Sequence, residues 1–421
     1  MVDLDRRAVE ILKANDRGGF TLPSARLYPH QWNWDSAFAA LGFAEFDLDR
    51  AWTEIETLFE GQWPNGMLPH IIYRHDEAAY FPGPEVWACE RTPPTSGHSQ
   101  PPVAATVVRT LFERDRAAGE ARARALLPKL LAWHRWFHET RDPEGCGVIA
   151  ATHPWESGRD NAPDWDEAMA RVDPAGVTPY ARHDIHEVDP SMRPTGDDYD
   201  RYVRLIEWGR AARWDHLRIT REGPLAVADP GLTFILARAD RDLGALAEAL
   251  DETESAAVTA AWLDRAAEGA ALLWQEHLRT YAARDLRGDL PAEGVSSVGF
   301  LAFYAGLSDP RRDARLLCTL DRILASAPFG VPSFDPAHPK FDARRYWRGP
   351  VWPVMNYLIG RGLDEAGLVD TAARVRRDTR RLVEAAGFYE YFDPRDGAGA
   401  GAGDFTWTAA VWLAWASPSK A

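Results

Sequence analysis

The sequence is poor in cysteine. Its 421 residues include only Cys89, Cys146 and Cys318, which are odd in number, widely spaced and without a CxxC pattern. This argues against a disulfide framework and against a structural zinc site. The cysteine content fits a reducing compartment best.

Long apolar runs are also missing. Met1 to Phe20 carries charges throughout and has no apolar stretch of the kind found in signal peptides. Nowhere does the sequence hold a run of about 18 apolar residues, the length that a membrane-spanning helix needs. We therefore expect a cytoplasmic protein that is neither exported nor membrane-spanning.

Positive charge is scarce relative to negative charge. The sequence has 48 Lys and Arg against 63 Asp and Glu, a formal net charge of −15. A nucleic-acid binder needs basic side chains to displace counterions from phosphates, so we expect no nucleic-acid partner. With 46% hydrophobic and 26% charged residues, the composition is that of a globular protein able to bury a large core.

Tryptophan, in contrast, is abundant, with 18 residues. An indole ring offers a large apolar face and one N–H donor, and such faces stack well on sugar rings in open clefts. Ordinary core packing accounts for tryptophan equally well. The tryptophan content by itself therefore decides nothing.

Helical periodicity dominates the chain, and long strands are hard to find. Apolar residues recur at spacings of three and four, which is typical of amphipathic helices. This pattern predicts an all-α chain with helices over residues 35–46, 103–116, 121–140, 198–214, 230–250, 256–283, 311–327, 350–363 and 365–386.

Three connecting segments are unusually long. Gly61 to Pro102, His153 to Arg193 and Phe329 to Gly349 are rich in aromatic, Pro and acidic residues, and loops of such length inside a compact domain are usually functional. No Ser/Gly linker or change in composition marks a domain boundary. Loops carrying aromatic and acidic residues recur before apolar helices, which favours helical pairs in a ring with these loops at one end.

For several short motifs, a structural role is favoured over a catalytic or binding role. The glycine-rich run Asp396-Gly-Ala-Gly-Ala-Gly-Ala-Gly-Asp404 follows no expected strand and has no Walker lysine, so a turning loop before a helix at Phe405 is favoured over a nucleotide site. His134 and His138 lie four apart, but the glutamate of an HExxH site is absent. Arg182-His-Asp-Ile-His-Glu187 holds two imidazoles and two carboxylates, for which a solvated polar loop is preferred over a metal site. No G-x-S-x-G motif or cysteine-nucleophile signature occurs.

The remaining candidate functional residues are carboxylates that lie among aromatic residues in the sequence. His153 to Trp165 and Gly387 to Pro394 each place acidic residues in an aromatic-rich loop, where desolvation would raise a carboxyl pKa and suit a general acid. Either segment alone could hold solvated or helix-capping acids. Together they suggest the paired carboxylates of a glycosidase.

Several ordered segments carry a resemblance to glycoside hydrolase family 63. They are Tyr28-Pro-His-Gln-Trp-Asn-Trp-Asp35, His153-Pro-Trp-Glu-Ser-Gly-Arg-Asp-Asn161, Tyr346-Trp-Arg-Gly-Pro-Val-Trp352, Tyr389-Glu-Tyr-Phe-Asp-Pro-Arg-Asp-Gly397 and Phe405-Thr-Trp-Thr-Ala409. Within that family, the chain is most similar to the compact bacterial mannosylglycerate and glucosylglycerate hydrolases. The resemblance extends over nearly the full length.

The resemblance implies an (α/α)6 toroid, formed by residues 1–421 as a single catalytic domain, with the three long loops as a lid over the active site. It implies hydrolysis with inversion at the anomeric carbon, without metal or cofactor. By motif position, Asp160 would be the general acid and Glu390 the general base. Glu156 and Asp164 remain alternatives for the acid, and Asp393 for the base.

The same comparison implies a set of substrate-binding residues. Asp35 would accept hydrogen bonds from vicinal hydroxyls, and Arg193 with Tyr199 would hold a glycerate carboxylate, because a carboxylate entering an acidic protein needs a compensating donor such as a guanidinium. His70 and Tyr80 would complete the lid. The remaining residues expected around the sugar are Tyr28, Trp32, Trp34, Gln100, Tyr346, Trp347, Gly349 and Trp352.

The expected activity is that of an inverting α-glycosidase which releases hexose and glycerate from α-mannosylglycerate, α-glucosylglycerate or both. One alternative is an α-glucosidase of the same family acting on neutral oligosaccharides, for which Arg193 would have no anionic partner. Another is a non-catalytic carbohydrate-binding toroid. The expected partner is a small anionic glycoside, and the sequence is also compatible with a homo-oligomer.

Overall fold

One set of helices forms a closed ring at the centre of the molecule. In the computed structural model, which describes residues 3–77, 80–307 and 309–420, α2 contacts α5, and contacts continue through α11, α13, α15 and α17 back to α2. Protein covers α2 on all sides, and every residue of this helix is buried. The bounds of the ring helices are α2 Asn33–Phe43, α5 Ala104–Arg114, α11 Pro230–Ala249, α13 Leu301–Ala305, α15 Pro353–Glu365 and α17 Thr406–Val411.

A second set of helices packs outside this ring. α1 covers α17, α3 covers α2 and α5, α6 covers α5 and α11, α12 covers α11, and α16 covers α15, while α14 packs against β6. These helices are amphipathic: α16 buries Val375, Thr379 and Leu382 at spacings of three and four. Their bounds are α1 Leu4–Asn15, α3 Leu48–Leu58, α6 Arg116–Thr140, α12 Thr253–Leu273, α14 Pro310–Ser326 and α16 Val369–Ala386.

Shorter helices and two-residue strands complete the fold. β3, β4, β7 and β8 form one antiparallel sheet in that order, and β1 pairs with β2, β5 with β6 and β9 with β10. The helices are α4 Pro84–Trp87, α7 Asp166–Met169, α8 Asp184–Glu187, α9 Gly196–Ala211 and α10 His216–Glu222. The strands are β1 Gln31–Trp32, β2 Ile71–Ile72, β3 Ala150–Ala151, β4 Val227–Ala228, β5 Trp274–Gln275, β6 Thr280–Tyr281, β7 Arg284–Asp285, β8 Leu290–Pro291, β9 Tyr391–Phe392 and β10 Gly399–Ala400.

The expectation of a mostly helical chain is confirmed, with one helix predicted too long. The helix expected over residues 256–283 ends at Leu273, because Trp274 turns extended and pairs with Tyr281 in the β5–β6 hairpin. The helix expected at Phe405 is found as α17, whereas α1, α3, α13 and the short helices α4, α7, α8 and α10 are not predicted. In α1 and α3, the side chains of Asp3 and Asp47 cap the first turn by accepting backbone N–H groups.

The N-terminal ends of several inner helices carry or follow the aromatic and acidic motifs. Trp34 and Asp35 lie in the first turn of α2, Trp407 lies in the first turn of α17, and Trp352 immediately precedes α15. Each of these helix ends has a partial positive charge, which favours negative groups nearby. The long loops that accompany these ends therefore gather at the same side of the ring.

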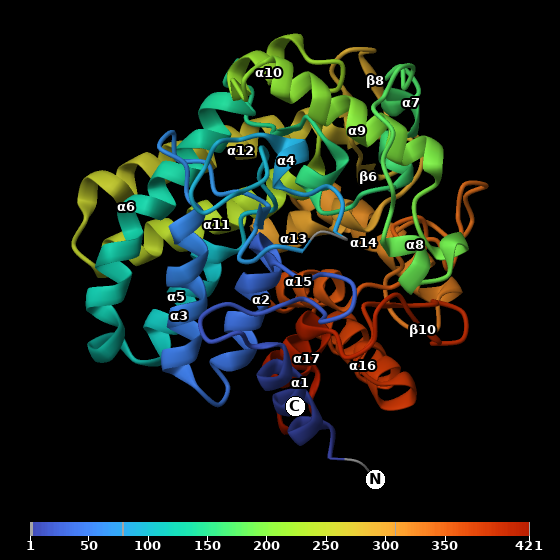
Figure 1. Ribbon diagram of the computed structural model, residues 1–421. Coiled ribbons are helices and arrows are strands. Elements are labelled where there is room, and N and C mark those ends of the chain that lie inside the picture. The colour runs from blue at the N-terminus through green and yellow to red at the C-terminus, as the bar shows by residue number, and fades with distance from the viewer. Residues whose placement is uncertain (1–2, 78–79, 308, 421) are drawn as a thin grey trace.

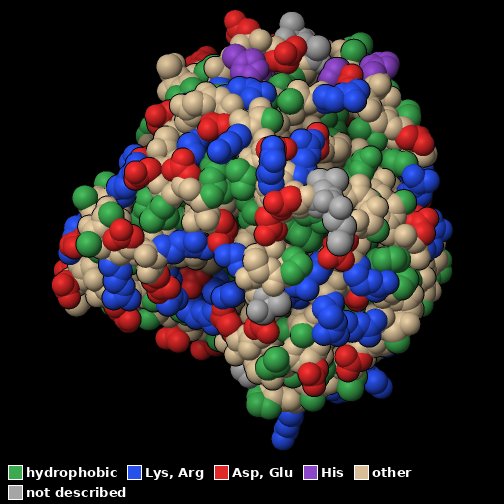
Figure 2. Space-filling model, turned by 90° about the horizontal axis from the view of Figure 1, so that it is seen from below, with side chains coloured by type: hydrophobic (Ala, Val, Ile, Leu, Met, Phe, Trp, Pro, Cys, Tyr) green, Lys and Arg blue, Asp and Glu red, His purple; other side chains and the backbone are tan. Residues whose placement is uncertain are grey.

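The surface and the ends of the chain add two observations. Acidic and basic side chains are intermixed over the face seen from below (Figure 2). Both ends of the chain lie near α1 (Figure 1), where Trp412 and Ser417 donate hydrogen bonds to Asp5. Within the described residues, none of the helices has the length and apolar character needed to cross a membrane.

Candidate active site

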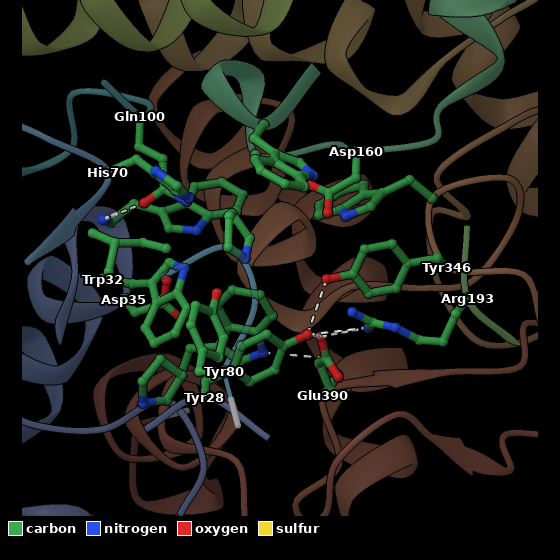
Figure 3. Close-up of a pocket in the computed structure, with 18 of the residues that line it drawn as sticks. Tyr28, Trp32, Asp35, His70, Tyr80, Gln100, Asp160, Arg193, Tyr346 and Glu390 are labelled. Carbon is green, nitrogen blue, oxygen red and sulfur yellow. Dashed lines mark hydrogen bonds and ion pairs between the residues drawn. The ribbon is translucent and has the colours of Figure 1, made fainter. Parts of the chain in front are cut away.

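A pocket lies among the long loops, beside the N-terminal ends of α2 and α17, and Figure 3 shows residues that line it. It brings together residues from distant parts of the chain. All but two of the predicted site residues line it: Tyr28, Trp32, Trp34, Asp35, His70, Tyr80, Gln100, Asp160, Arg193, Tyr199, Tyr346, Trp347 and Glu390.

Asp160 and Glu390 face the pocket from different sides (Figure 3). Asp160 follows the short helical turn Pro154–Ser157, and Glu390 immediately precedes β9. The sequence separates them by 230 positions, the difference of their two numbers, yet the fold places both carboxylates on one cavity. Two carboxylates on a shared cavity are the arrangement that acid–base hydrolysis of a glycoside requires.

Glu390 is surrounded by hydrogen-bond donors. Tyr28 Oη donates to Glu390 Oε1 at 2.8 Å, the Ala402 N–H donates to Oε2 at 3.1 Å, and Arg193 Nη1 lies 3.9 Å from Oε1. Burial raises the pKa of Glu390, while Arg193, Tyr28 and the Ala402 N–H oppose the rise by stabilising the charged form. These donors make Glu390 the better placed of the two carboxylates to accept a proton.

Asp160 has a different environment. Its backbone is fixed, because Tyr202 Oη donates to Asp160 O at 2.8 Å, but no side chain of the described residues donates to its carboxylate. Although the carboxylate is partly accessible from the pocket, burial raises the pKa of Asp160 to about 7, and Arg193 only partly offsets this. At neutral pH a substantial fraction of Asp160 therefore carries the proton that a general acid donates.

The neighbouring acids are occupied by ion pairs. Arg141 Nη2 lies 2.6 Å from Glu156 Oε1, and both side chains are fully buried. Arg159 Nη1 lies 3.1 Å from Asp164 Oδ2 and its Nη2 lies 2.8 Å from Asp229 Oδ1, while Arg395 Nη2 lies 2.7 Å from Asp393 Oδ2. None of these carboxylates lines the pocket within the described residues.

Asp35 is a third carboxylate on the pocket. It lies in the first turn of α2, is 5% exposed, and has its pKa raised well above the usual value by burial and by the nearby Glu390. Beside it, Gln100 Oε1 accepts the Trp34 N–H at 3.3 Å. This contact joins the start of α2 to the loop that precedes α5.

Arg193 is the one Lys or Arg among the described residues that line the pocket. Its Nε donates to Asp184 Oδ2 at 2.9 Å, its Nη1 donates to Tyr28 Oη at 3.1 Å, and the guanidinium lies 4.2 Å from the centre of the Tyr346 ring. The side chain is 3% exposed. A cation so firmly held is suited to bind an anionic part of a ligand.

Aromatic rings form much of the wall. Trp32 packs edge-on against Tyr28 and Tyr80, with centroids 5.3 and 5.6 Å apart. His70 stacks on His98 at 4.5 Å, and burial lowers the pKa of His70 well below its usual value, so its imidazole is neutral at physiological pH. Tyr199 lies beneath the Arg182 guanidinium at 3.7 Å.

Two predicted site residues do not line the pocket. Trp352 lies behind Trp347, with ring centroids 3.9 Å apart and planes 4° apart, and its Nε1 donates to Tyr346 O at 3.2 Å. Gly349 packs against Asp342, whose carbonyl oxygen would lie 2.4 Å from a Cβ on the glycine. Both residues support the wall rather than form it.

The pocket also includes residues that the sequence analysis did not assign to it. Trp155, Phe405 and Trp407 belong to the quoted motifs, so their segments were identified but not their orientation. Gly158 also lies in one of these motifs, whereas the remaining residues carry no signal that composition or spacing could reveal. These additional lining residues are Pro23, Ile71, Phe81, Pro82, Trp155, Gly158, Phe405 and Trp407.

The polar segment Arg182 to Glu187 is held by ion pairs. Arg182 Nη2 lies 2.7 Å from Asp184 Oδ2, and Arg26 Nη2 lies 3.0 Å from Glu187 Oε2. Within the described residues, no group of three or more His, Cys, Asp or Glu side chains is arranged to hold a metal ion. The carboxylates of this segment instead neutralise arginines near the pocket.

A family model described as "Mannosylglycerate hydrolase MGH1-like glycoside hydrolase domain" matches residues 28–408. The chain belongs to this family. The match begins at Tyr28 and ends after Trp407, so it spans the residues that line the pocket apart from Pro23.

Similar proteins of known name cover almost the whole chain. Mannosylglycerate hydrolase MGH1 from Selaginella moellendorffii is 45% identical over 96% of this chain and 84% of its own. A mannosylglycerate hydrolase from Thermus thermophilus is 44% identical over 97% of this chain and 99% of its own. A glucosylglycerate hydrolase from Mycolicibacterium hassiacum is 36% identical over 98% and 97%, respectively.

Comparison with solved structures points to the same family. The Thermus thermophilus family 63 mannosylglycerate hydrolase in complex with Tris and D-glycerate has a TM-score of 0.95 at 44% identity, covering 98% of this chain and 99% of its own. The same enzyme in complex with glucose has a TM-score of 0.91 at 44% identity, covering 98% of this chain and 100% of its own. Neutral trehalase from Saccharomyces cerevisiae, at 17% identity and a TM-score of 0.61 over 94% of this chain and 72% of its own, shares the fold.

Proposed function

We propose that the protein hydrolyses α-mannosylglycerate, α-glucosylglycerate or both to hexose and glycerate, with inversion at the anomeric carbon. The observation that carries this proposal is the pair Asp160 and Glu390, which share one pocket but differ in their hydrogen-bond donors. Membership of a glycoside hydrolase family and close relatives named for these two substrates support the substrate class.

In the proposed reaction, Asp160 donates its proton to the glycosidic oxygen as the bond from that oxygen to the anomeric carbon breaks. A water molecule attacks the anomeric carbon from the opposite face, and Glu390 accepts a proton from that water. Glycerate leaves with the proton of Asp160, and the hexose gains a hydroxyl of inverted configuration. Room for the water requires the two carboxyl groups to be about 6.5–9.5 Å apart in the substrate complex.

The aromatic wall and Asp35 form the proposed hexose site. The Asp35 carboxylate can accept two hydrogen bonds from neighbouring hydroxyls, and Gln100 and Tyr346 add polar contacts. Indole faces exclude water and pack against the apolar faces of a sugar ring. The residues assigned to this site are Tyr28, Trp32, Trp34, Asp35, Gln100, Tyr346 and Trp347.

Arg193 is the proposed partner of the glycerate carboxylate. Its Nε and Nη1 donate to Asp184 and Tyr28, so Nη2 is the nitrogen for which the described residues show no hydrogen-bond partner. A relative at 44% identity has been solved with D-glycerate, which supports an anion site of this kind. Tyr199, His70 and Tyr80 line the same pocket and complete the proposed subsite.

We propose that the fold is an (α/α)6 toroid and forms a single catalytic domain. The closed inner ring, its outer helices and one continuous core cluster support this assignment. Residues 61–102, 153–193 and 329–349 form the proposed lid, because Phe81 stacks on Tyr180 at 4.6 Å across two of these loops. A cytoplasmic location is proposed on the three cysteines, which form no disulfide in the described residues.

A second function of the same class is an α-glucosidase acting on neutral oligosaccharides. The observation that favours it is the ion pair between Arg193 and Asp184, which neutralises the guanidinium without any ligand. The remaining alternative is a non-catalytic carbohydrate-binding toroid. Such a protein would bind the sugar and release no product.

Proton NMR of the protein mixed separately with mannosylglycerate and glucosylglycerate tests the proposal. The expected result is initial release of the β-hexose, before mutarotation, from one or both compounds. Release of the α-hexose would overturn inversion. Cleavage of neutral α-glucosides alone would favour the second function, and binding without cleavage would favour the non-catalytic alternative.

A further inference from the structure

The glycine-rich run Asp396–Asp404 lies directly against Glu390. β10 lies within this run and pairs with β9, which brings the chain back to the residue that precedes β9. The Glu390 N–H donates to Ala402 O at 2.9 Å, and the Ala402 N–H donates back to Glu390 Oε2 at 3.1 Å. The run thus contacts both the backbone and the carboxylate of Glu390.

Gly401 is the glycine of this run at which a Cβ would come closest to the carboxylate. A Cβ at this position would lie 2.4 Å from Glu390 Oε2, 2.6 Å from the Tyr391 ring and 2.9 Å from the Glu390 Cβ. Its φ of +71° also lies in the left-handed region that favours glycine. Any side chain here would displace the carboxylate or its loop.

The other contacts of Glu390 are equally specific. Trp407 Nε1 donates to Glu390 O at 3.1 Å, which fixes the backbone from the opposite side to Ala402. Tyr28 occupies one direction of Oε1 at 2.8 Å. The carboxylate therefore has little freedom to rotate, and its orientation depends on the space that Gly401 leaves open.

We propose that Gly401 and the Ala402 amide are positioning groups for Glu390: the missing side chain at 401 and the N–H at 402 together set the orientation of the carboxylate that accepts the proton of the attacking water. This inference rests on the proposed role of Glu390 as general base. It assigns a function to the glycine-rich run, which the sequence analysis interpreted only as a turn.

The physical consequence of disturbing this arrangement is twofold. A Cβ at 2.4 Å must force the carboxylate away by roughly 1 Å to reach normal contact distance, and a misplacement of that size can cost about 10²-fold in rate. Loss of the Ala402 N–H bond also removes a group that lowers the pKa of Glu390. The base would then become protonated at a higher pH than before.

The test compares Gly401→Ala with two glycines of the same run. Gly397 has a nearly equal φ of +77° but lies against Phe329 and Leu382, so Gly397→Ala introduces backbone strain without touching Glu390. Gly403 has no positive φ, and a Cβ there would lie 3.8 Å from a ring atom of Tyr389, which is ordinary contact, so Gly403→Ala introduces neither change.

For Gly401→Ala we expect kcat to fall about 10- to 100-fold with KM changed less than about threefold. The acid limb of its kcat/KM profile should move to higher pH. Gly397→Ala should lower the melting temperature while keeping kcat and the pH profile, and Gly403→Ala should match the parent protein. A Gly401→Ala variant whose kcat and acid limb match those of Gly397→Ala would overturn the inference.

Two further variants keep the test decisive. Glu390→Gln separates the inference from the proposed function: a fully active Glu390→Gln refutes the base assignment itself, whereas an inactive one leaves only Gly401 under test. Glu390→Asp withdraws the carboxylate from the space of the new methyl group. The extra loss of melting temperature in Gly401→Ala, relative to Gly397→Ala, should therefore shrink in the Glu390→Asp background, and an undiminished loss would contradict the contact.

Discussion

The two sides of the pocket differ in the hydrogen-bond donors that they place around a buried carboxylate. On the Glu390 side, a phenol, a backbone amide and a guanidinium surround the acid, all of them groups that stabilise its charged form. On the Asp160 side, the described residues place their donors on the backbone of the loop and none of their side chains on the carboxylate. Both acids are desolvated, so the donors make the difference.

This contrast supports the proposed roles of the two carboxylates, an acid and a base in one pocket at the same pH. Burial alone raises the pKa of any carboxyl group, whereas donors aimed at the carboxylate lower it again. With its pKa raised to about 7, Asp160 carries its proton in a substantial fraction of molecules near neutrality. The division of roles thus depends on neighbouring groups more than on depth of burial.

The largest expected effect comes from removing each carboxylate. Asp160→Asn should lower kcat on mannosylglycerate by about 10²–10⁴-fold, yet retain far more activity on a dinitrophenyl α-mannoside, whose leaving group needs no proton. Glu390→Gln should lose activity on both substrates, because both need an activated water. Steady-state kinetics on the two substrates measure the contrast.

Asp393→Asn serves as the control for these variants, since Asp393 lies close to Glu390 in sequence but is paired with Arg395. It should keep near-parental activity on both substrates. If Asp160→Asn lost the activated substrate as completely as mannosylglycerate, the assignment of the general acid would be wrong.

Arg193 links the two sides, and its removal should have the next largest effect. Arg193→Met should raise KM for mannosylglycerate by about 10- to 100-fold, because a charge-assisted hydrogen bond to the carboxylate is lost. KM for a neutral aryl α-mannoside should change much less. Arg26→Met, which removes an arginine that is 82% exposed, is the matched control. An equal rise in KM for both substrates would point to the neutral-substrate alternative.

Tyr28→Phe should give the smallest effect and would sharpen the comparison most. It removes the 2.8 Å hydrogen bond to Glu390 Oε1, which lowers the pKa of Glu390. Because the base must be deprotonated to act, the acid limb of kcat/KM should move to higher pH, with kcat reduced about 10-fold or less.

The control for this variant is Tyr180→Phe, which removes a hydroxyl that donates to Asp200 instead of to the pocket. Its pH profile should coincide with that of the parent protein. An acid limb that moved to lower pH in Tyr28→Phe would contradict the proposed effect of the donor on Glu390.

Much of the helical framework could be predicted from the sequence, because three-to-four spacing of apolar residues is a local signal. The same signal fails at Trp274, where the chain leaves α12 to form a hairpin with Tyr281. That pairing depends on a partner outside the helix. The short inner helix α13 escaped prediction because protein surrounds it, so it shows no polar face to give a period.

Site residues could be predicted where a sequence motif contains them. They could not be predicted where the orientation of a side chain decides whether it lines the pocket. Motif position identified Asp160 and Glu390, which do line the pocket, but it also assigned Trp352, which lies behind Trp347. The pairing of Arg193 with Asp184 could not be foreseen, since it depends on how a long loop folds back. The contact between Gly401 and Glu390 is likewise a property of the β9–β10 hairpin.

The stacked indoles of Trp347 and Trp352 give the protein an optical signature. The ring centroids lie 3.9 Å apart and the planes differ by only 4°, so the electronic transitions of the two indoles can couple. Trp347 forms part of the pocket wall, while Trp352 is held behind it by the Tyr346 carbonyl. A sugar that settles against Trp347 changes one chromophore of a coupled pair, so occupancy of the pocket can be followed spectroscopically without a label.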